Sequence, residues 1–263
     1  MDSTTIIGDV DRRGVATLVL NRPDKGNPFN GGMLAAVADR VQAWRRAAEV
    51  RVVVLRGAGR HFCTGADLGP GSHDPGAGPS LDEVCRLIDG LPKPTVSVVQ
   101  GACLGGGLAL AGCCDVLLAQ RDAFFAIPEV RLGFAAAPMT PFFLRMMGAR
   151  PLRRYGLTGE RFSADIALRL GVAHELCDEA TREDVLDLIL DGLLLGAPSA
   201  QAEMKSLCRT LEGRPYSKEL ALELQQAFVA MRDGADGVEG RAAFREKRKP
   251  AWYPEPRANG ELP

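Results

Sequence analysis

Short apolar runs alternate with one long amphipathic pattern in the first third of the chain. Val15–Leu20 is a β-branched run that ends at the turn-forming letters NRPDKGNP. From residue 32 to residue 48, apolar side chains such as Met33, Val37 and Val41 recur at helical spacing. A second compact apolar run, Arg51–Arg56, is closed by GAGRHFCTGAD. The opening third is therefore predicted to fold as strand, helix, strand.

The middle of the chain continues this alternation around a glycine-rich stretch. A helix is predicted at 82–89 and a strand in PKPTVSVVQG, followed by the glycine run, a helix, a strand in DVLLAQ and a short strand at 124–127. Between the first and second thirds, GPGSHDPGAGPS (69–80) holds few apolar residues and many glycines and prolines. This composition predicts a flexible loop.

Beyond residue 127 the apolar spacing becomes helical. The predicted helices are 141–147, 151–157, 163–170, 182–195, 200–211 and 218–231. The two halves therefore differ, with mixed α/β structure first and mostly helix afterwards. This asymmetry argues against a simple doubly wound fold, in which strands continue to the end.

Composition and charge exclude some classes of function but do not identify one. The 263 residues are 46% hydrophobic and 25% charged, with a formal net charge of −1, which is ordinary for a globular protein and favours neither nucleic acid nor a membrane as partner. Seven cysteines at irregular spacing include no CxxC pair, so we expect buried reduced thiols and no metal site. The first residues lack a long apolar core, and a cytoplasmic location is expected.

The stretch GACLGGGLALAGCCD (101–115) raises the first chemical question. A Walker loop is excluded because no lysine follows the glycines, and the GxGxxG spacing also fails. A membrane helix is disfavoured because Gln100 and Asp115 interrupt the apolar run and glycines are dense. Two interpretations remain open: close packing of a strand on a helix, or backbone N–H groups exposed at a helix N-terminus to stabilise an anion.

Two other segments complete a possible catalytic set. In HFCTGADL (61–68) a strand ends and turns at Gly65, which leaves the N–H of Ala66 available. In IPEVRLG (127–133), Glu129 follows Pro128 among apolar residues, and such surroundings raise the pKa of a carboxyl group toward neutrality. A single glutamate is more often a surface carboxylate, but the three segments together favour proton transfer beside an oxyanion hole.

The quoted motifs, in this order, resemble the crotonase (enoyl-CoA hydratase/isomerase) superfamily. They are LNRPDKGNPFN (20–30), HFCTGADL (61–68), PKPTVSVVQGACLGGG (92–107), CDVLLA (114–119), FAIPEVRLG (125–133), LTGERFSADIALRLGVAHEL (157–176) and FREKRKPAW (244–252). The resemblance implies an α/β fold, a spiral of ββα units over 1–195 followed by a helical trimerisation region over 196–263. It also implies an acyl-CoA thioester substrate and a homotrimer or dimer of trimers.

The resemblance also assigns roles by position. The N–H groups of Ala66 and Gly106 form the oxyanion hole, and Glu129 is the acid/base. No separate cofactor is implied, because coenzyme A is part of the substrate.

Further residues are expected to bind the substrate. Lys25 and the segment from Ala66 through Asp67 to Leu68 lie near the CoA portion, and Phe134 is a candidate for the acyl pocket. In the basic tail, Lys247 approaches the CoA phosphates of a neighbouring subunit.

One departure leaves the reaction open. Hydratases with two glutamates carry GGGxE, whereas Ala109 stands at that position here. Hydration of a 2-enoyl-CoA therefore competes with isomerisation, thioester hydrolysis or decarboxylation by Glu129 alone, and with a non-enzymatic acyl-CoA binder. The stretch EVRLGFAAAPMTPFFLRMMGARPLRRYGLTGERF resembles the methylglutaconyl-CoA hydratase type, which handles branched acyl chains, and this similarity favours hydration.

The remaining reactive side chains are assigned structural roles. His61 is expected to be a loop or surface group, and Cys63 and Cys103 are expected to be inert packing residues because no basic partner lies near them in sequence. Asp115 is expected to order a turn.

Overall fold

A computed structural model of the chain describes residues 5–69 and 78–254. Its main sheet has six strands in the order β1-β2-β3-β4-β6-β9, in which β1 and β2 form an antiparallel hairpin and the other neighbours are parallel. These strands are β1 (Ile6–Val10), β2 (Val15–Leu20), β3 (Val52–Gly57), β4 (Thr95–Val99), β6 (Val116–Gln120) and β9 (Glu175–Cys177). Most of the predicted loop at 69–80 lies outside the described residues.

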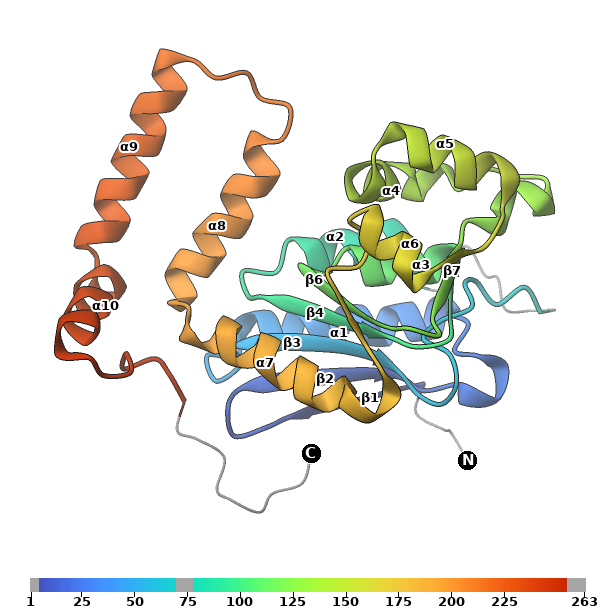
Figure 1. The fold of residues 1–263 in the computed structure, drawn as a ribbon, viewed down its shortest axis with the longest axis horizontal. Helices are drawn as coiled ribbons and strands as arrows, with labels where there is room; N and C mark the ends of the chain where they lie inside the picture. Colours follow the sequence, from blue (N-terminus) through green and yellow to red (C-terminus); the bar gives the residue numbers. More distant parts are fainter. Residues whose placement is uncertain (1–4, 70–77, 255–263) are drawn as a thin grey trace.

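Helices cover both faces of this sheet, as Figure 1 shows. Successive residues of β3 face opposite sides, so Val53 and Leu55 pack in the core with α1, α2 and α3, while Val52 and Val54 pack against α7. These helices are α1 (Gly31–Arg46), α2 (Leu81–Asp89), α3 (Gly106–Gly112) and α7 (Arg182–Leu195). Burial on both faces explains why the central strands are continuous apolar runs rather than alternating ones.

The helix predicted at 32–48 is confirmed as α1. Its apolar stripe, which includes Met33, Val37 and Val41, is buried against the sheet. The preceding Asn30 ends the turn with its side-chain oxygen accepting a hydrogen bond from the N–H of Met33 at 3.0 Å, which satisfies one donor of the first turn. Local sequence and tertiary packing therefore agree on where this helix begins.

A second, three-stranded sheet supports the glycine run. Its order is β5-β7-β8, with β5 and β7 parallel and β7 and β8 antiparallel. The strands are β5 (Ala102–Leu104), β7 (Phe124–Ala126) and β8 (Phe162–Ser163). β5 leads directly into α3, and β7 leads directly into the 3₁₀ helix η2 (Pro128–Leu132), so this small sheet holds two of the predicted site segments side by side.

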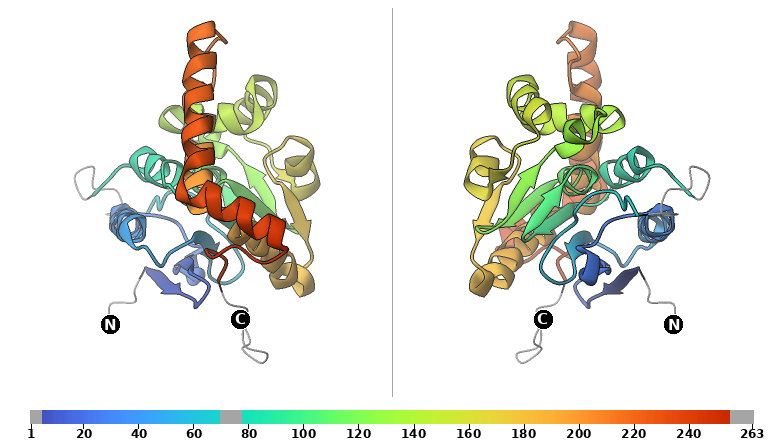
Figure 2. Two further views of the ribbon diagram at one scale, coloured as in Figure 1. Left: turned by 90° about the vertical axis from the view of Figure 1, so that its left-hand side faces the viewer. Right: turned by 90° about the vertical axis from the view of Figure 1, so that its right-hand side faces the viewer.

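The C-terminal part is an extended helical arm. Helices α4 (Thr140–Met147), α5 (Ala149–Thr158) and α6 (Ala164–Arg169) lie over the core, and α8 (Pro198–Leu211), α9 (Lys218–Asp233) and α10 (Ala235–Glu246) follow α7. Figure 2 shows α9 standing clear of the sheets. No side chain of α8 is fully buried. Within the described ranges no single helix is long and apolar enough to cross a membrane, and only the bent pair Glu179–Leu195 with Pro198–Leu211 meets that test when its halves are combined.

The helical interpretation of the second half is incomplete. β8 and β9 both lie beyond residue 127, and β9 joins the main sheet beside β6. β1 and β5 also carried no sequence prediction. β5, β8 and β9 have only two or three residues, so their apolar patterns are too brief to separate from turns and helices. β1 is an edge strand in which no residue is fully buried, so its apolar pattern is weak.

Candidate active site

The segment after β3 presents the first backbone donor. The N–H of Phe29 donates to the carbonyl of Gly65 at 2.9 Å, and the N–H of Asp67 donates to the carbonyl of Phe29 at 2.8 Å. Phe29 and Ala66 are partners in a parallel bridge, a pattern in which one residue bonds to both neighbours of its partner. The N–H of Ala66 therefore faces away from Phe29, and no acceptor within 5–69 or 78–254 takes it.

The second donor is at the start of α3. The N–H of Gly105 donates a hydrogen bond to the carbonyl of Ala126 at 2.9 Å. The N–H of Gly106, in the first turn of the helix, has no acceptor in the described part of the chain. A Cβ on Gly106 would lie 2.6 Å from the ring of Phe29 and 2.6 Å from Cδ2 of Leu81. The donor is therefore walled by apolar side chains, and only glycine fits beneath them.

Paired backbones hold the two donor segments together. Cys63 and Cys103 are partners in a parallel bridge, with the N–H of Cys63 bonded to the carbonyl of Ala102 at 3.1 Å and the N–H of Leu104 bonded to the carbonyl of Cys63 at 3.0 Å. Ala66 follows one side of this bridge and Gly106 follows the other. The register of the pairing thus fixes the relative position of the two N–H groups.

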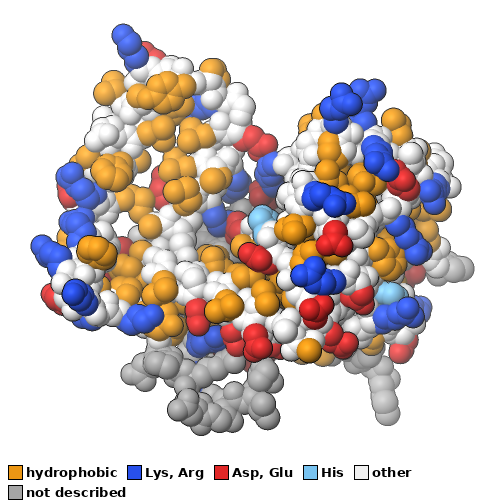
Figure 3. All heavy atoms as spheres, in the orientation of Figure 1, with side chains coloured by type: hydrophobic (Ala, Val, Ile, Leu, Met, Phe, Trp, Pro, Cys, Tyr) orange, Lys and Arg blue, Asp and Glu red, His pale blue; other side chains and the backbone are white. Residues whose placement is uncertain are grey.

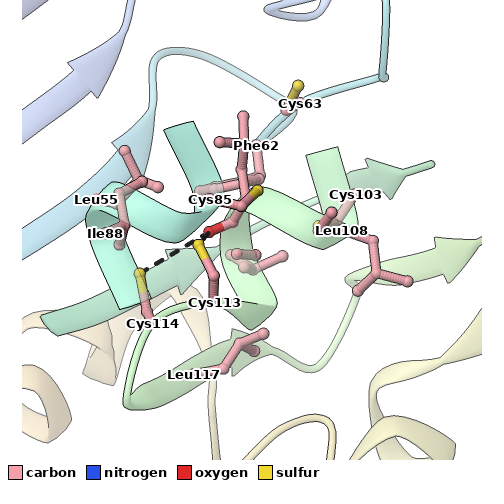
Figure 4. Packing of buried hydrophobic residues seen from close by; sticks show 14 of the residues in the cluster. Leu55, Phe62, Cys63, Cys85, Ile88, Cys103, Leu108, Cys113, Cys114 and Leu117 are labelled. Carbon is pink, nitrogen blue, oxygen red and sulfur yellow. Dashed lines mark hydrogen bonds between the residues drawn. The ribbon is translucent and has the colours of Figure 1, made fainter. Parts of the chain in front are cut away.

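The thiols behind the site are buried packing groups, as predicted. Burial raises the pKa of the Cys63 thiol to about 12 and raises that of Cys103 well above its usual value. Figure 4 shows Cys63 and Cys103 among apolar side chains, together with Cys85, Cys113 and Cys114 between α2 and α3. Of the seven cysteines, all free, only Cys208 is exposed.

The carboxyl group of Glu129 meets the glycine run. Glu129 lies in η2, and a Cβ on Gly105 would come within 2.3 Å of its Oε1 atom. Gly105 also has φ +51° and ψ −121°, a conformation that side chains disfavour. The carboxyl oxygen therefore rests on bare backbone beside the Gly106 donor.

One oxygen of the Glu129 carboxyl group, Oε2, is buried without a hydrogen-bond partner among the described residues. Burial raises the pKa of the carboxyl group, and a hydrogen bond from its own backbone N–H opposes the shift. An unpartnered carboxyl oxygen in an apolar wall is suited to accept a proton from a reactant.

The other predicted substrate residues divide into near and distant groups. Asp67 and Leu68 directly follow Ala66, and Leu68 is exposed. Lys25 is an exposed residue of η1 (Pro23–Lys25), whose next residue, Gly26, accepts a hydrogen bond from Thr64 at 3.0 Å. Phe134 is half exposed just after η2. Lys247 ends α10, which lies at the opposite end of the molecule from β7 in Figure 1, so one chain does not bring it to the site.

Three residues outside the donor set have defined positions. Ala109 is fully buried in α3, so its position, where two-glutamate hydratases carry a glutamate, supplies no carboxyl group. His61 lies in a loop, as expected, and its Nδ1 accepts a hydrogen bond from the N–H of Ala102 at 3.0 Å, so it also supports the start of β5. Asp115 accepts hydrogen bonds from the N–H and hydroxyl of Thr95, which confirms its structural role.

Sequence reasoning missed the apolar wall of the site. Phe29 and Leu81 are far from Gly106 in sequence, and no local pattern links them to it. The role of Gly105 was also missed, although the unusual triplet was the signal for it. No group of three or more His, Cys, Asp or Glu side chains in the described ranges can hold a metal ion.

Two free backbone donors and a half-buried carboxyl group form a site that can stabilise an oxyanion and move a proton. The six-stranded sheet, the small second sheet and the helical second half define the class of α/β fold to which the chain belongs. The family model for enoyl-CoA hydratase/isomerase matches residues 11–255. The chain therefore belongs to the enoyl-CoA hydratase/isomerase family, the predicted crotonase superfamily, and is a hydratase-like enzyme.

Several relatives are similar over almost the whole chain. An enoyl-CoA hydratase, AKT6-1, of Alternaria alternata is 31% identical over 244 residues, which cover 91% of this chain and 81% of the relative. The 1,2-epoxyphenylacetyl-CoA isomerase of Escherichia coli is 32% identical over 250 residues, covering 91% and 95%. The crystal structure of an enoyl-CoA hydratase from Shewanella pealeana superposes with a TM-score of 0.88 at 32% identity, covering 95% and 96%.

Proposed function

We propose that this enzyme adds water across the double bond of a 2-enoyl-CoA. The observation that carries the proposal is the buried, unpartnered Oε2 of Glu129, held against Gly105 beside the free N–H of Gly106. A carboxyl group with no partner in the protein is left available for a reactant proton. The hydratase-named relatives support the same reaction.

The chemistry follows from the three groups. Glu129 takes a proton from a water molecule as the water oxygen bonds to Cβ of the substrate, and the electrons of the Cα–Cβ double bond move toward the thioester. The N–H groups of Ala66 and Gly106 hold the resulting enolate oxygen. Glu129 then returns its proton to Cα, the carbon–oxygen double bond re-forms, and one carboxyl group has served as base and acid in turn. One such N–H donor contributes about 3–4 kcal/mol in comparable sites.

Substitution of Glu129 tests the proposal. Glu129→Gln keeps the shape of the side chain but removes the base, so hydration of a suitable 2-enoyl-CoA is expected to fall by about 10²–10⁴-fold. Glu160→Gln is the matched control, because Glu160 pairs with Arg154 on the surface at 2.8 Å and has no place in the site. Circular dichroism confirms that both variants are folded. Unchanged hydration by Glu129→Gln overturns the proposal.

Isomerisation is the second candidate, and Ala109 favours it. The buried methyl group of Ala109 offers no second acid at the glycine run, and a single carboxyl group suffices to move a proton from one carbon to another. One relative is named an isomerase. Parallel product analysis with 2-enoyl-CoA, 3-enoyl-CoA and a β-carboxylated acyl-CoA separates hydration, isomerisation, hydrolysis and decarboxylation. A 3-hydroxyacyl-CoA product from the 2-enoyl substrate supports hydration.

The substrate is proposed to carry a branched or carboxylated acyl chain. The proposal rests on the resemblance of residues 129–162 to the methylglutaconyl-CoA hydratase type. Phe134, half exposed beside Glu129, is a candidate wall for this chain. Lys25, Asp67 and Leu68 are the candidate contacts of the CoA part, because Asp67 and Leu68 directly follow Ala66 and the turn that holds Lys25 bonds to Thr64. A screen of linear, branched, aromatic and carboxylated enoyl-CoAs tests the assignment.

We also propose a homotrimer or a dimer of trimers. The helical arm exposes large apolar side chains, among them Met204, Leu222, Phe228 and Phe244. Figure 3 shows hydrophobic side chains gathered over this arm, at the left of the view. Such a patch is unusual on a monomer and is typical of a subunit interface. In this assembly Lys247 meets the CoA of a neighbouring subunit. Sedimentation equilibrium is expected to give three or six times 28.1 kDa.

A further inference from the structure

The turn after β2 is tied to the Ala66 segment by a nearly buried ion pair. The guanidinium group of Arg22 donates one hydrogen bond to the carbonyl of Pro28 at 2.6 Å and another to Oδ2 of Asp67 at 2.6 Å. The side chains of Arg22 and Asp67 are 16% and 13% exposed. Because the guanidinium group is rigid and planar, its two hydrogen bonds fix both the orientation of Asp67 relative to the turn and the distance between them.

Asn27 braces the same turn from the other side. It is fully buried with φ +57°, its Oδ1 accepts the backbone N–H of Arg22 at 2.8 Å, and its Nδ2 donates to the carbonyls of Ala58 and His61 at 2.8 and 2.7 Å. Buried hydrogen bonds of Asn27 thus fix the turn to the loop after β3. The side chain of Arg22 connects the same turn to Asp67.

The orientation of the Ala66 N–H depends on contacts made by the residues around it. The N–H of Ala66 has no partner of its own in the described chain, so its direction is set entirely by its neighbours. On one side stands Gly65, whose φ of +99° belongs to a residue with wide backbone freedom. On the other side stands Asp67, whose side chain is held by Arg22. The peptide that carries the donor is held at its carbonyl end by the N–H of Phe29, which donates to the Gly65 oxygen at 2.9 Å, and on its other side by Asp67, whose side chain is bound by Arg22.

We propose that Arg22 is a positioning residue, which acts through Asp67 to aim the Ala66 N–H at the substrate oxygen. This inference rests on the proposed function, because it assigns Ala66 to the oxyanion hole. The hydrogen bond from Arg22 is the first cause of the lowered pKa of Asp67, which is consistent with a persistent pair. Asp67, expected from sequence to lie near CoA, then serves the donor that precedes it.

Kinetics of three variants test the inference. Arg22→Met keeps an unbranched apolar side chain but removes the guanidinium group and both hydrogen bonds, so kcat is expected to fall roughly 10- to 100-fold, since a misplaced donor loses less than a deleted one. KM should change by less than about threefold, because the donor acts on the charge that develops during reaction. Arg22→Lys can keep the charge and one bond, and it is expected to recover part of the loss.

Arg56→Met is the matched control. Arg56 makes a two-bond pair with Glu183 of α7 at 2.9 and 2.6 Å, and its side chain is 23% exposed, similar to that of Arg22. This pair lies between β3 and α7, on the face of the sheet away from α3. Loss of stability is expected in both Met variants, but only Arg22→Met should lose kcat. An equal loss of kcat in both overturns the inference.

Infrared spectroscopy supplies a readout that a purely structural role would not move. The thioester carbonyl of a ¹³C-labelled 2-enoyl-CoA is measured in the Glu129→Gln background, where turnover is slow, with and without Arg22→Met. Bound carbonyl frequency falls when donors polarise the bond, and Arg22→Met is expected to reverse part of this fall. If the carbonyl frequency falls on binding and Arg22→Met does not change that fall, the positioning role alone is overturned. A carbonyl with no fall in the Glu129→Gln protein itself overturns the proposed oxyanion hole.

Discussion

Substitution of Gly105 by alanine measures how closely Glu129 depends on the bare backbone beneath it. The new Cβ would lie 2.3 Å from Oε1, 3.1 Å from Cδ and 3.4 Å from Oε2 of Glu129, all in one carboxyl group. Carbon and oxygen atoms that are not bonded do not approach to 2.3 Å, so the carboxyl group has to withdraw by roughly 1 Å. The perturbation therefore reaches the proposed base without altering its chemistry.

The expected loss follows from this displacement. A shift of about 1 Å in a catalytic group reduces the rate by about 100-fold, which corresponds to about 2.7 kcal/mol of activation free energy. The alanine also occupies φ +51°, ψ −121°, which lowers the free energy of unfolding by about 1–3 kcal/mol. We expect a folded protein with low kcat and a KM for the acyl-CoA close to that of the wild type.

Gly112→Ala provides a control with the same overlap on the same helix. A Cβ on Gly112 would lie 2.3 Å from Sδ of Met146, but methionine is flexible and the backbone at Gly112 has no positive φ. Its kcat should stay within about threefold of wild type, since the new methyl group does not reach the site. Steady-state hydration assays on both variants make the comparison, with thermal unfolding to confirm folding.

A double variant separates Glu129 from other causes. If Gly105→Ala acts through the carboxyl group, adding it to Glu129→Gln should lower kcat little further, because the two changes damage one unit. Full multiplication of the two losses would show that the glycine acts elsewhere. A Gly105→Ala enzyme with wild-type kcat would refute the placement of Glu129 at the reacting atoms.

Three further predictions concern stability. Burial raises the pKa of Glu129, so the ionised carboxyl group destabilises the folded protein at neutral pH. Glu129→Gln should therefore raise the free energy of unfolding by on the order of 1 kcal/mol at neutral pH. Urea titrations should show this gain vanish as pH falls below about 4.5, where the carboxyl group is protonated in both states. His61 has the opposite sign: burial lowers its pKa and its Nδ1 must accept from Ala102, so stability should fall as pH drops below about 6.5, and a His61→Gln variant that kept this dependence would contradict the reasoning. Asp115→Ala removes the acceptor of two Thr95 hydrogen bonds and the ion-pair partner of Lys205, and it should lower the free energy of unfolding by about 2–4 kcal/mol without changing the kcat of the folded fraction. A loss of kcat in that fraction would speak against a structural role.

The sequence alone predicted the elements whose patterns are long or sharply bounded. The stripe containing Met33, Val37 and Val41 predicted α1, and the run before Gly57 predicted β3, because spacing and burial act locally in both. The ordered motifs also indicated the superfamily, which the family match and the structural neighbours confirm. The division at residue 195, the site roles, the lack of a cofactor and the trimer stay predictions.

Tertiary structure decided how the pieces meet. Ala66, Gly106 and Glu129 lie on three separate segments, and their meeting depends on the Cys63–Cys103 bridge and on β5 pairing with β7, neither of which leaves a periodic trace in so few residues. The strand at 175–177 was missed for the same reason.

The glycine triplet shows the limit most clearly. Its composition determined that a side chain would be excluded there, because glycine alone permits both positive φ and close approach. Only the folded chain shows what approaches: the carboxyl group of Glu129 at Gly105, and Phe29 with Leu81 at Gly106. Sequence records that space is needed, whereas long-range packing decides which group occupies it.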